Sequence, residues 1–162
     1  MSQLALAKLK EAFPREVLAT SDYRGDETAT IAREHVKAVC RFLRDDPDLQ
    51  FDLPVDLTCV DYLGEEPRFE VVYHLYSTTK RHRIRLKARV PEDDPALDSV
   101  ADVWPGFNWS EREAYDMYGV RFVGHPDLRR ILLYPEFVGH PLRKDYPKEG
   151  RQPLVRREDP PQ

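Results

Sequence analysis

The sequence predicts an α+β fold, in which helices pack on one face of an antiparallel or mixed sheet. Residues 68–76 and 81–90 alternate apolar and polar side chains, a pattern typical of strands buried on one face. Ahead of them, four apolar residues recur at the spacing of one helix face, namely Val36, Val39, Cys40 and Leu43. A proline-rich stretch near the C-terminus keeps neither pattern, and we expect an extended arm there.

The 162-residue chain is long enough for one domain with an ordinary core. We divide it into an α+β domain at residues 1–103, a helix with a docking arm at 104–147, and a polar tail at 148–162. No apolar run approaches the roughly 20 residues that cross a bilayer, and the N-terminus lacks the apolar segment of a secretory signal. We therefore expect a soluble, cytoplasmic protein.

Four elements are expected before the two long strands: a helix that ends at Pro14, a hairpin, a second helix and a third strand. The first helix carries Leu6, Leu9 and Phe13 on one face. The others, in chain order, are strands at 17–23 and 28–31 around the turn Arg24-Gly25-Asp26, a helix through Val36 to Leu43, and a strand at 57–63. The two cysteines, Cys40 and Cys59, fall on buried positions, so we expect reduced thiols and no iron–sulfur cluster.

We expect the two long strands to form a hairpin around a turn at residues 77–80. In this register Val71 pairs with Leu86 and Tyr73 pairs with Ile84 on the core face. On the other face, the register sets Glu70 opposite Lys87, a favourable cross-strand charge pair.

The outward face of the second long strand is basic, with Arg81, Arg83, Arg85, Lys87 and Arg89. Such a face is either exposed to solvent or binds an acidic partner. RNA-binding sheets stack bases on exposed aromatic residues, and only Tyr76 and His74 could serve here. The acidic balance of residues 1–120, with 16 Lys and Arg against 23 Asp and Glu, also argues against nucleic acid as a partner.

Two short helices are expected after the sheet. Pro95 suits the first turn of a helix that runs to Val103 with Asp94 as its cap. The second helix covers 109–118. It has two alternative capping boxes, Asn108 with Glu111 and Ser110 with Glu113, and Gly119 follows its last residue.

After Gly119 the chain becomes rich in proline but stays apolar. Seven of the fourteen prolines lie in the last 37 residues, yet large apolar residues from Val120 to Tyr146 are retained. A disordered tail would be depleted of such residues. We therefore expect an arm that packs on the domain or on a neighbouring subunit, and a domain truncated after Gly119 that still folds.

A charged cluster, Glu111, Arg112, Glu113 and Asp116, marks the second short helix. Metal binding is disfavoured because Glu111 and Glu113 point about 200° apart around a helix. Arg112 and Asp116 have the spacing of an ion pair on one helix face. The cluster is either a solvated helix face or part of an interface.

Two segments of the arm repeat one pattern: Gly124-His125-Pro126 with Arg129, and Gly139-His140-Pro141 with Arg143. The repeat is a docking device or a coincidence of turn chemistry. No Cys and His spacing supports a metal site there. The chain also has no phosphate-binding glycine loop or nucleophile motif, so we expect no active site.

Three motifs together resemble the signature of a known family, the C subunit (the 30-kDa subunit) of respiratory complex I. The motifs are Glu111-Arg112-Glu113-Ala114-Tyr115-Asp116-Met117-Tyr118-Gly119, Gly124-His125-Pro126-Asp127-Leu128-Arg129-Arg130-Ile131-Leu132, and Gly139-His140-Pro141-Leu142-Arg143-Lys144-Asp145-Tyr146-Pro147. The resemblance is dense over residues 104–147. Tyr118 departs from it mildly, because phenylalanine is commoner at that position.

The resemblance implies a non-catalytic structural subunit of the peripheral arm of a proton-translocating NADH:quinone oxidoreductase. Its implied partner is chiefly the D subunit, the large subunit that helps form the quinone pocket, and then the B and I subunits, without nucleic acid. It implies no metal, flavin, iron–sulfur cluster or quinone in this chain, and a place on the cytoplasmic side of the membrane, reached only through the complex. The chain contains no sequence like the D subunit, so we expect that subunit to be a separate polypeptide.

The resemblance places the partner interface on the three motifs. Its expected residues are Glu111, Arg112, Glu113, Asp116, Gly119, His125, Pro126, Arg129, Arg130, His140, Pro141, Arg143, Lys144 and Tyr146. Two alternatives stay open: the equivalent subunit of a ferredoxin- or F420-dependent relative, and a stand-alone adaptor that binds RNA or protein.

Overall fold

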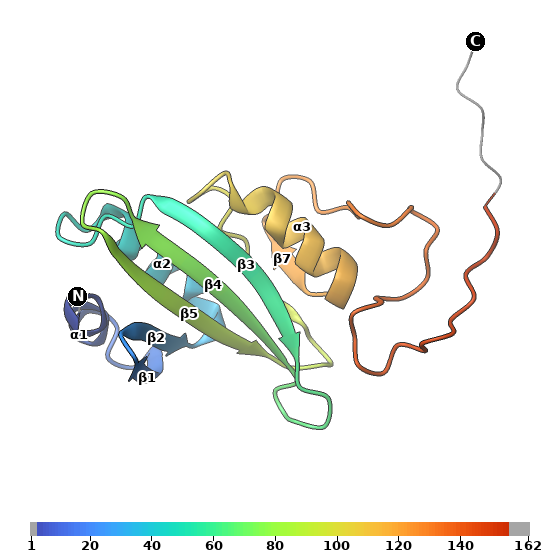
Figure 1. Ribbon diagram of the computed structural model, residues 1–162, viewed down its shortest axis with the longest axis horizontal. Helices are drawn as coiled ribbons and strands as arrows, with labels where there is room; N and C mark the ends of the chain where they lie inside the picture. The colour runs from blue at the N-terminus through green and yellow to red at the C-terminus, as the bar shows by residue number, and fades with distance from the viewer. Residues whose placement is uncertain (1–2, 156–162) are drawn as a thin grey trace, which may run out of the picture.

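A five-stranded sheet forms the centre of the computed structural model, which describes residues 3–155 (Figure 1). The strands lie in the order β1-β2-β5-β4-β3. Their bounds are β1 (Val17–Tyr23), β2 (Asp26–Ile31), β3 (Leu53–Asp61), β4 (Phe69–Ser77) and β5 (His82–Val90). Neighbouring strands are antiparallel, except that β2 pairs parallel with β5. The sheet is therefore mixed, and the predicted α+β class is confirmed.

Helices cover one face of this sheet. Their bounds are α1 (Gln3–Ala12), a short 3-10 helix η1 (Arg33–His35), α2 (Val36–Asp45) and α3 (Phe107–Tyr118). In Figure 1, α2 lies behind the central strands and no helix lies in front of β3, β4 and β5. The helices bury their predicted apolar residues against alternate residues of the strands. These include Leu6, Leu9, Val36, Val39, Cys40 and Leu43, and opposite them Leu57, Cys59, Val71, Tyr73, Leu75, Ile84 and Leu86. Both cysteines are free and buried, as predicted.

The pairing of β4 with β5 differs from the predicted register by two residues. Val71 pairs with Ala88 and Tyr73 pairs with Leu86. The cause is the turn: Ser77 still pairs with His82, so the turn contains residues 78–81 rather than 77–80. A shift of two residues keeps every side chain on its predicted face, because the side-chain period of a strand is two. Lys87 still reaches Glu70 diagonally at 2.9 Å.

The predicted helix from Pro95 to Val103 is wrong. Strand β6 (Ala96–Asp98) stands there and pairs parallel with β7 (Arg121–Val123). The Pro95 carbonyl accepts the backbone N–H of Arg121 at 2.7 Å, an interaction that starts this two-stranded ladder. The Asp94 carboxylate, expected as a helix cap, pairs instead with the guanidinium of Arg121 at 2.9 Å. Long-range pairing thus outweighs the local helix signal.

Strand β3 and the segment after Gly119 also differ from the prediction. Strand β3 begins at Leu53 and ends at Asp61, so it starts four residues before the expected 57 and ends two before 63. Strand β7 brings Phe122 into the core together with Val120, which are 2% and 0% exposed. A cut after Gly119 would therefore remove core residues, which argues against the expectation that such a truncation still folds.

Candidate protein-docking site on helix α3 and the C-terminal arm

Helix α3 starts two residues before the expected Trp109. Gly106 precedes it, with no side-chain cap, so neither capping box forms. Backbone bonds from Phe107 to Trp104 and from Asn108 to Pro105 hold its first turn instead. The buried side chains of Trp104 and Phe107, whose rings meet edge to face, explain this earlier start because both anchor the turn in the core.

Gly119 ends the helix as predicted, in the left-handed conformation with φ of 79°. The position demands glycine for a second reason. A Cβ atom at Gly119 would lie 2.6 Å from both Arg143 Nη2 and His140 Nε2. The later part of the chain therefore packs directly against the end of α3.

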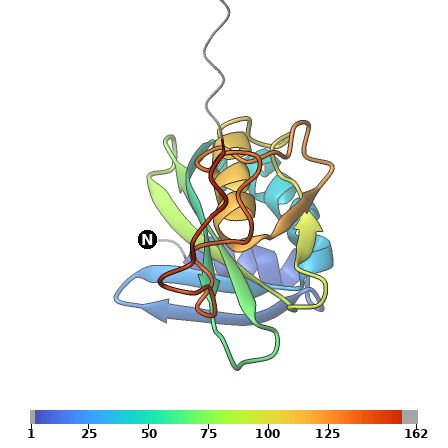
Figure 2. The same cartoon turned by 90° about the vertical axis from the view of Figure 1, so that its right-hand side faces the viewer.

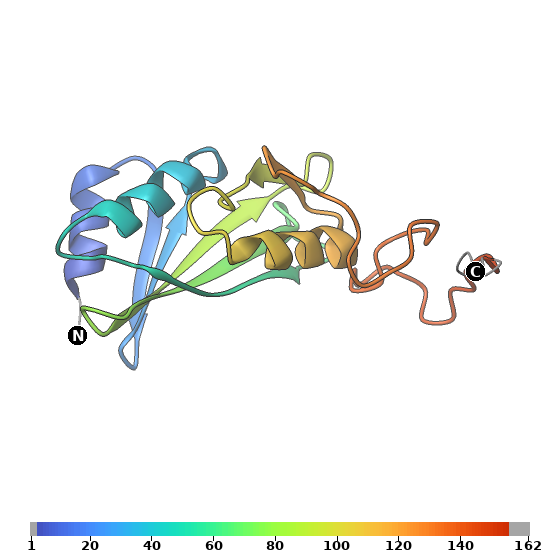
Figure 3. The same ribbon diagram turned by 90° about the horizontal axis from the view of Figure 1, so that it is seen from above.

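The arm, defined here as residues 124–155, contains no helix or strand over its described length. Figure 2 shows it crossing in front of α3, and Figure 3 shows it reaching beyond the helix, away from the sheet. The polar tail expected at 148–162 lies outside the described residues from 156 onward. Between 124 and 146 the arm is held to α3 and the sheet by polar contacts.

The Asp116 carboxylate is the main anchor of the arm. It is fully buried, and its Oδ2 accepts three consecutive backbone N–H groups, from Ile131, Leu132 and Leu133, at 2.8–3.0 Å. Its Oδ1 pairs with Arg130 at 2.6 Å. Burial on its own would raise the pKa of Asp116, but the hydrogen bonds from these N–H groups and from Arg130 outweigh it and lower the pKa. The carboxylate is held ionised in a cradle of donors.

Glu111 lies on the opposite, domain-facing side of α3. It is fully buried and accepts the Ser99 hydroxyl at 2.6 Å and the Val100 backbone N–H at 2.7 Å. Burial raises the pKa of Glu111 to about 7, and those two hydrogen bonds oppose the rise. The carboxylate thus ties α3 to the turn that follows β6.

Arg112 does not pair with Asp116, so the predicted ion pair on the helix face is wrong. Its guanidinium donates to the carbonyl oxygens of Arg129 and Arg130, each at 3.1 Å, and lies over the Trp109 ring. Arg112 and Asp116 do not pair because each binds the arm instead: Arg112 binds two carbonyl groups, and Asp116 pairs with Arg130.

The two repeated histidines both dock on α3, one near each end. His125 Nδ1 accepts the backbone N–H of Asp127, so the Nε2 proton is free to donate to the Asn108 carbonyl at 3.1 Å. His140 Nδ1 donates to the Asp116 carbonyl at 2.9 Å. Burial, followed by the charges of Arg143 and Arg130, lowers the pKa of His140 despite this bond. The repeat is therefore a docking device within the chain.

Arg143 caps the C-terminal end of α3. Its Nε donates to the Tyr118 carbonyl at 2.6 Å, and its guanidinium lies over the Phe69 ring. Tyr146 packs against Gly139, where a Cβ atom would come within 2.8 Å of its ring, and stacks on Phe137. The third motif thus closes the arm back onto the first.

Sequence patterns assigned no functional role to Arg68 and Asp61, which clamp the end of the arm. Arg68 is 2% exposed, pairs bidentately with buried Asp61 at 2.8 Å, and holds Asp145 of the arm at 2.7 Å. The backbone N–H of Lys144 donates to Asp61. One sequence signal could have indicated Asp61. It continues the core-facing alternation of Leu57 and Cys59, and a buried carboxylate at that position needs a partner.

The arm turns most of its apolar side chains outward. Leu132, Val138 and Leu142 are 62%, 67% and 48% exposed, and Trp109 on α3 is 64% exposed. Among the expected interface residues, the structure leaves exposed Glu113, Pro126, Arg129 and Lys144. Buried polar groups therefore hold the arm to its own domain, while apolar groups face away from it.

Within residues 3–155, no group of three His, Cys, Asp or Glu side chains could hold a metal ion. No helix among the described residues is long and apolar enough to cross a bilayer. The hollow at the arm, lined by Gly139, His140, Arg143, Asp145, Tyr146 and Pro147, measures about 210 Å³ and is shallow. This hollow is smaller than the roughly 300–1,000 Å³ typical of small-molecule sites.

The chain is similar to known proteins of one family. The family model described as the 30 kDa subunit of respiratory-chain NADH dehydrogenase matches residues 29–152. The C subunit of the NADH-quinone oxidoreductase of Geobacter sulfurreducens is 54% identical over 147 residues, which span 90% of either chain.

Two solved structures share the fold. The trypsin-resistant fragment (1-134) of Nqo5 is 32% identical and superposes with a TM-score of 0.68, over 77% of this chain and all of that one. A chain of the membrane-bound sulfane sulfur reductase, an archaeal respiratory membrane complex, is 25% identical. It superposes with a TM-score of 0.75 over 89% of this chain and 84% of that one.

Proposed function

The chain belongs to the family of the 30 kDa subunit of respiratory-chain NADH dehydrogenase, and from this premise we propose that α3 and the arm dock on the D subunit of the complex. As a member of this family it is a peripheral-arm subunit of NADH-quinone oxidoreductase, associated with the membrane through the complex and without an evident catalytic site of its own. The ferredoxin- or F420-dependent alternative is not favoured, because the 54% identical relative is an NADH-quinone oxidoreductase subunit.

The outward-facing apolar residues of the arm carry the proposal. Leu132, Tyr134, Val138 and Leu142 expose large apolar side chains on the arm, and Trp109 exposes another on α3. Such an arm gains little from its own domain by apolar burial, whereas a partner surface would bury these side chains at about 25 cal/mol per Å². Its polar contacts with α3 fix its path beforehand, which lowers the entropy cost of binding.

The exposed charged residues of the motifs complete the proposed interface. Glu113, Arg129 and Lys144 are exposed on α3 and the arm, and would supply the polar contacts of such an interface. The buried members, such as Asp116 and Arg130, act by shaping the arm rather than by touching the partner. We further propose that the chain holds no redox cofactor, contacts the B and I subunits elsewhere, and lies on the cytoplasmic side of the membrane.

Co-purification tests the docking. The tagged chain, expressed in cells that lack their own copy, is recovered from detergent-solubilised membranes, and the D subunit is quantified by mass spectrometry. We expect Leu132→Asp, and more strongly Leu132→Asp with Val138→Asp, to lower the recovered D subunit at least tenfold, because a carboxylate would be buried without a partner.

Leu18→Asp is the matched control, because Leu18 is 64% exposed, close to the 62% of Leu132, and lies in β1 away from the arm. This variant should recover the D subunit at the wild-type level. Wild-type recovery of the D subunit with the double arm variant would contradict docking through this surface. Recovery of the wild-type chain without any D subunit would contradict the proposal that the D subunit is its partner.

A further inference from the structure

The uncovered face of the sheet carries a group of arginines at the end formed by two turns. Arg83 and Arg85 lie on β5, while Arg24 lies in the turn between β1 and β2 and Arg81 in the turn between β4 and β5. Within residues 3–155, none of the four has a carboxylate oxygen within 4 Å, as the ion pairs of that part of the chain show. We call them the four-arginine surface.

The same face is neutralised at its other end. Lys87 pairs with Glu70 at 2.9 Å, and Arg89 pairs with Glu65 at 2.8 Å. Toward the two turns, the four arginines form no such ion pair among the described residues, although Asp26 and Glu27 line the same end of the face. Arginine outnumbers acidic residues there, in a chain whose net charge is −4. Burial, followed by the charge of Arg85, also lowers the pKa of His74, which lies between these ends.

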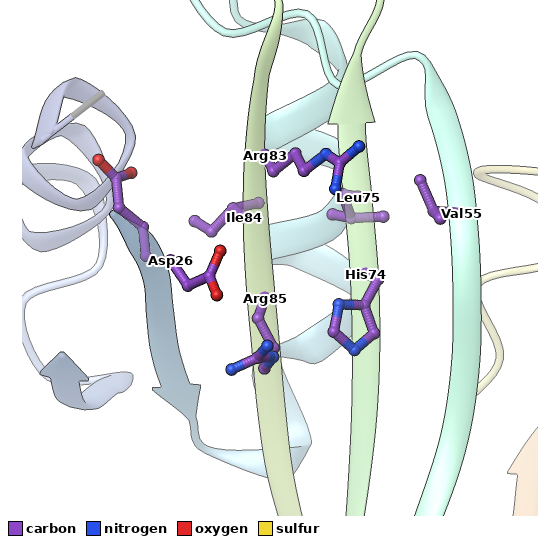
Figure 4. A pocket seen from close by; sticks show the side chains of 8 residues that line it. Asp26, Val55, His74, Leu75, Arg83, Ile84 and Arg85 are labelled. Atoms are coloured by element: carbon purple, nitrogen blue, oxygen red, sulfur yellow. The ribbon is translucent and has the colours of Figure 1, made fainter. Parts of the chain in front are cut away.

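Two adjoining hollows run along the four-arginine surface. One, of about 270 Å³, is lined by residues that include His74, Arg83 and Arg85, with Val55 at its rim (Figure 4). The other, of about 380 Å³, is lined by residues that include Arg24 and Arg81. Arg83, Asp26 and Glu27 line both, so the hollows form one groove that an extended segment could follow.

Backbone conformation gives an independent reason to assign a role to the turn arginines. Arg24 and Arg81 both have φ of 56°, in the left-handed region where glycine and asparagine are favoured. Arg24 and Gly25 form the two-residue turn between the paired residues Tyr23 and Asp26, a turn for which Asn-Gly is the preferred sequence. An arginine in this backbone conformation lowers stability. Residues in such strained conformations cluster at functional sites, so the strain suggests a role for these side chains.

We propose that the four-arginine surface binds an acidic segment of a partner protein. Guanidinium groups match carboxylates in planar, two-pronged hydrogen bonds. The Asp26 carboxylate lies in the groove beside Arg85, as Figure 4 shows, and it would repel the unbroken negative charge of a nucleic acid or an anionic membrane. A peptide offers N–H groups as well as carboxylates and so can satisfy both. This surface is separate from the arm and stands whether or not the arm docks on the D subunit.

Zero-length cross-linking of the intact complex tests the proposal. Lys80 is exposed and precedes Arg81 in the turn, so a carbodiimide should join its amine to carboxylates of a bound acidic segment. We expect mass spectrometry to find Lys80 joined to aspartate or glutamate of another subunit. In a complex that carries Arg24→Asn with Arg81→Asn, the yield should fall several-fold.

The substitutions also separate binding from folding. Asparagine relieves the left-handed backbone at both turns, so the isolated double variant should melt at or above the wild-type temperature. Lys10→Gln with Arg15→Gln removes two other exposed positive charges and should leave the Lys80 yield unchanged.

Three outcomes would overturn the proposal. The first is that no cross-link joins Lys80 to another subunit. The second is that the double variant Arg24→Asn with Arg81→Asn gives the same cross-link yield as the wild type. The third is binding of oligouridylate or of phosphatidylglycerol vesicles that the double variant loses, without any cross-link from Lys80, because it would assign the surface to nucleic acid or to lipid.

Discussion

At the scale of single residues, α3 buries two carboxylates whose pKa values move in opposite directions. Asp116 receives four donors from the arm, and its pKa is lowered. Glu111 receives two donors from the turn after β6, and burial raises its pKa to about 7. The number of donors explains the difference, because each hydrogen bond to a carboxylate favours the ionised form against the cost of burial.

Glu111 should therefore make stability depend on pH. Its pKa is higher in the folded chain than in the unfolded chain, where it is near 4.5, so the folded state binds more protons between about pH 4.5 and 7. Stability falls as pH rises through that window, by an amount on the order of 2–3 kcal/mol for this group. In Glu111→Gln, urea unfolding between pH 5 and 8 should show this dependence reduced.

Glu113→Gln provides the comparison, since Glu113 is exposed on the same helix. Its pH dependence should match that of the wild type. If Glu111→Gln and the wild type lost stability equally between pH 5 and 8, Glu111 would not be the titrating group.

The sequence identified these carboxylates but not their roles. Glu111, Arg112 and Asp116 stood out as a charged cluster on a predicted helix, and local spacing suggested a pair between Arg112 and Asp116. The true partners lie 11–17 residues away along the chain, at Val100 and Ser99 for Glu111 and at 130–133 for Asp116. Periodicity within one helix contains no information on such distant donors.

At the scale of elements, the alternation of apolar and polar residues correctly predicted which strand residues face the core. It did not predict the register in which β4 pairs with β5. The faces of β4 and β5 are as expected, while the pairing is displaced by two because the turn begins after Ser77. The helix expected at Pro95 failed for a similar reason. Strand β6 exists only because β7, from beyond α3, pairs with it. Local signals determine the faces of elements, whereas distant partners determine pairing.

Gly119 joins two elements, and its substitution should release the arm. Gly119→Ala adds a methyl group 2.6 Å from His140 and Arg143 at a φ of 79°. We expect a loss of about 2–4 kcal/mol in unfolding free energy, from backbone strain and displacement of the arm together. Limited trypsin digestion should also cleave faster at Arg129 and Arg130.

Gly124→Ala is the matched control, with a φ of 81° and no atom within 4 Å of the added methyl group. It should cost only the backbone strain, about 1 kcal/mol, and leave the digestion pattern of the arm unchanged. Equal effects of the two substitutions would show that the contact with His140 and Arg143 contributes nothing.

At the scale of the whole molecule, the arm is held to the domain largely by polar groups, while Leu132 and Val138 are exposed and Leu128 packs against the core. Apolar residues among prolines predicted that the arm must pack on something. The sequence could not divide its residues between domain and partner, because Arg130 and the neighbouring Arg129 look alike in sequence. Only the position of Asp116 separates them: Arg130 pairs with it, while Arg129 stays exposed.

Removing the arm should weaken the domain without unfolding it. A cut after Asp127 keeps β7 and the bond of His125 to α3, but leaves the buried Asp116 without its four donors. We expect the truncated chain to unfold cooperatively in urea with stability lower by roughly 3–5 kcal/mol, and to recover no D subunit from membranes. Wild-type stability, or undiminished recovery of the D subunit, would contradict the anchoring role of Asp116 or the docking role of the arm.

The parallel pairing of β2 with β5 also affects the order in which the chain folds as it is synthesised. Thr28 and its neighbour across the ladder, Arg85, are 57 residues apart, so the ribosome finishes the first hairpin roughly 3–11 s before the strand it joins. During that time the edge of β2 that later pairs with β5 leaves backbone N–H and C=O groups without their strand partner. The nascent hairpin therefore keeps an open edge until β5 emerges.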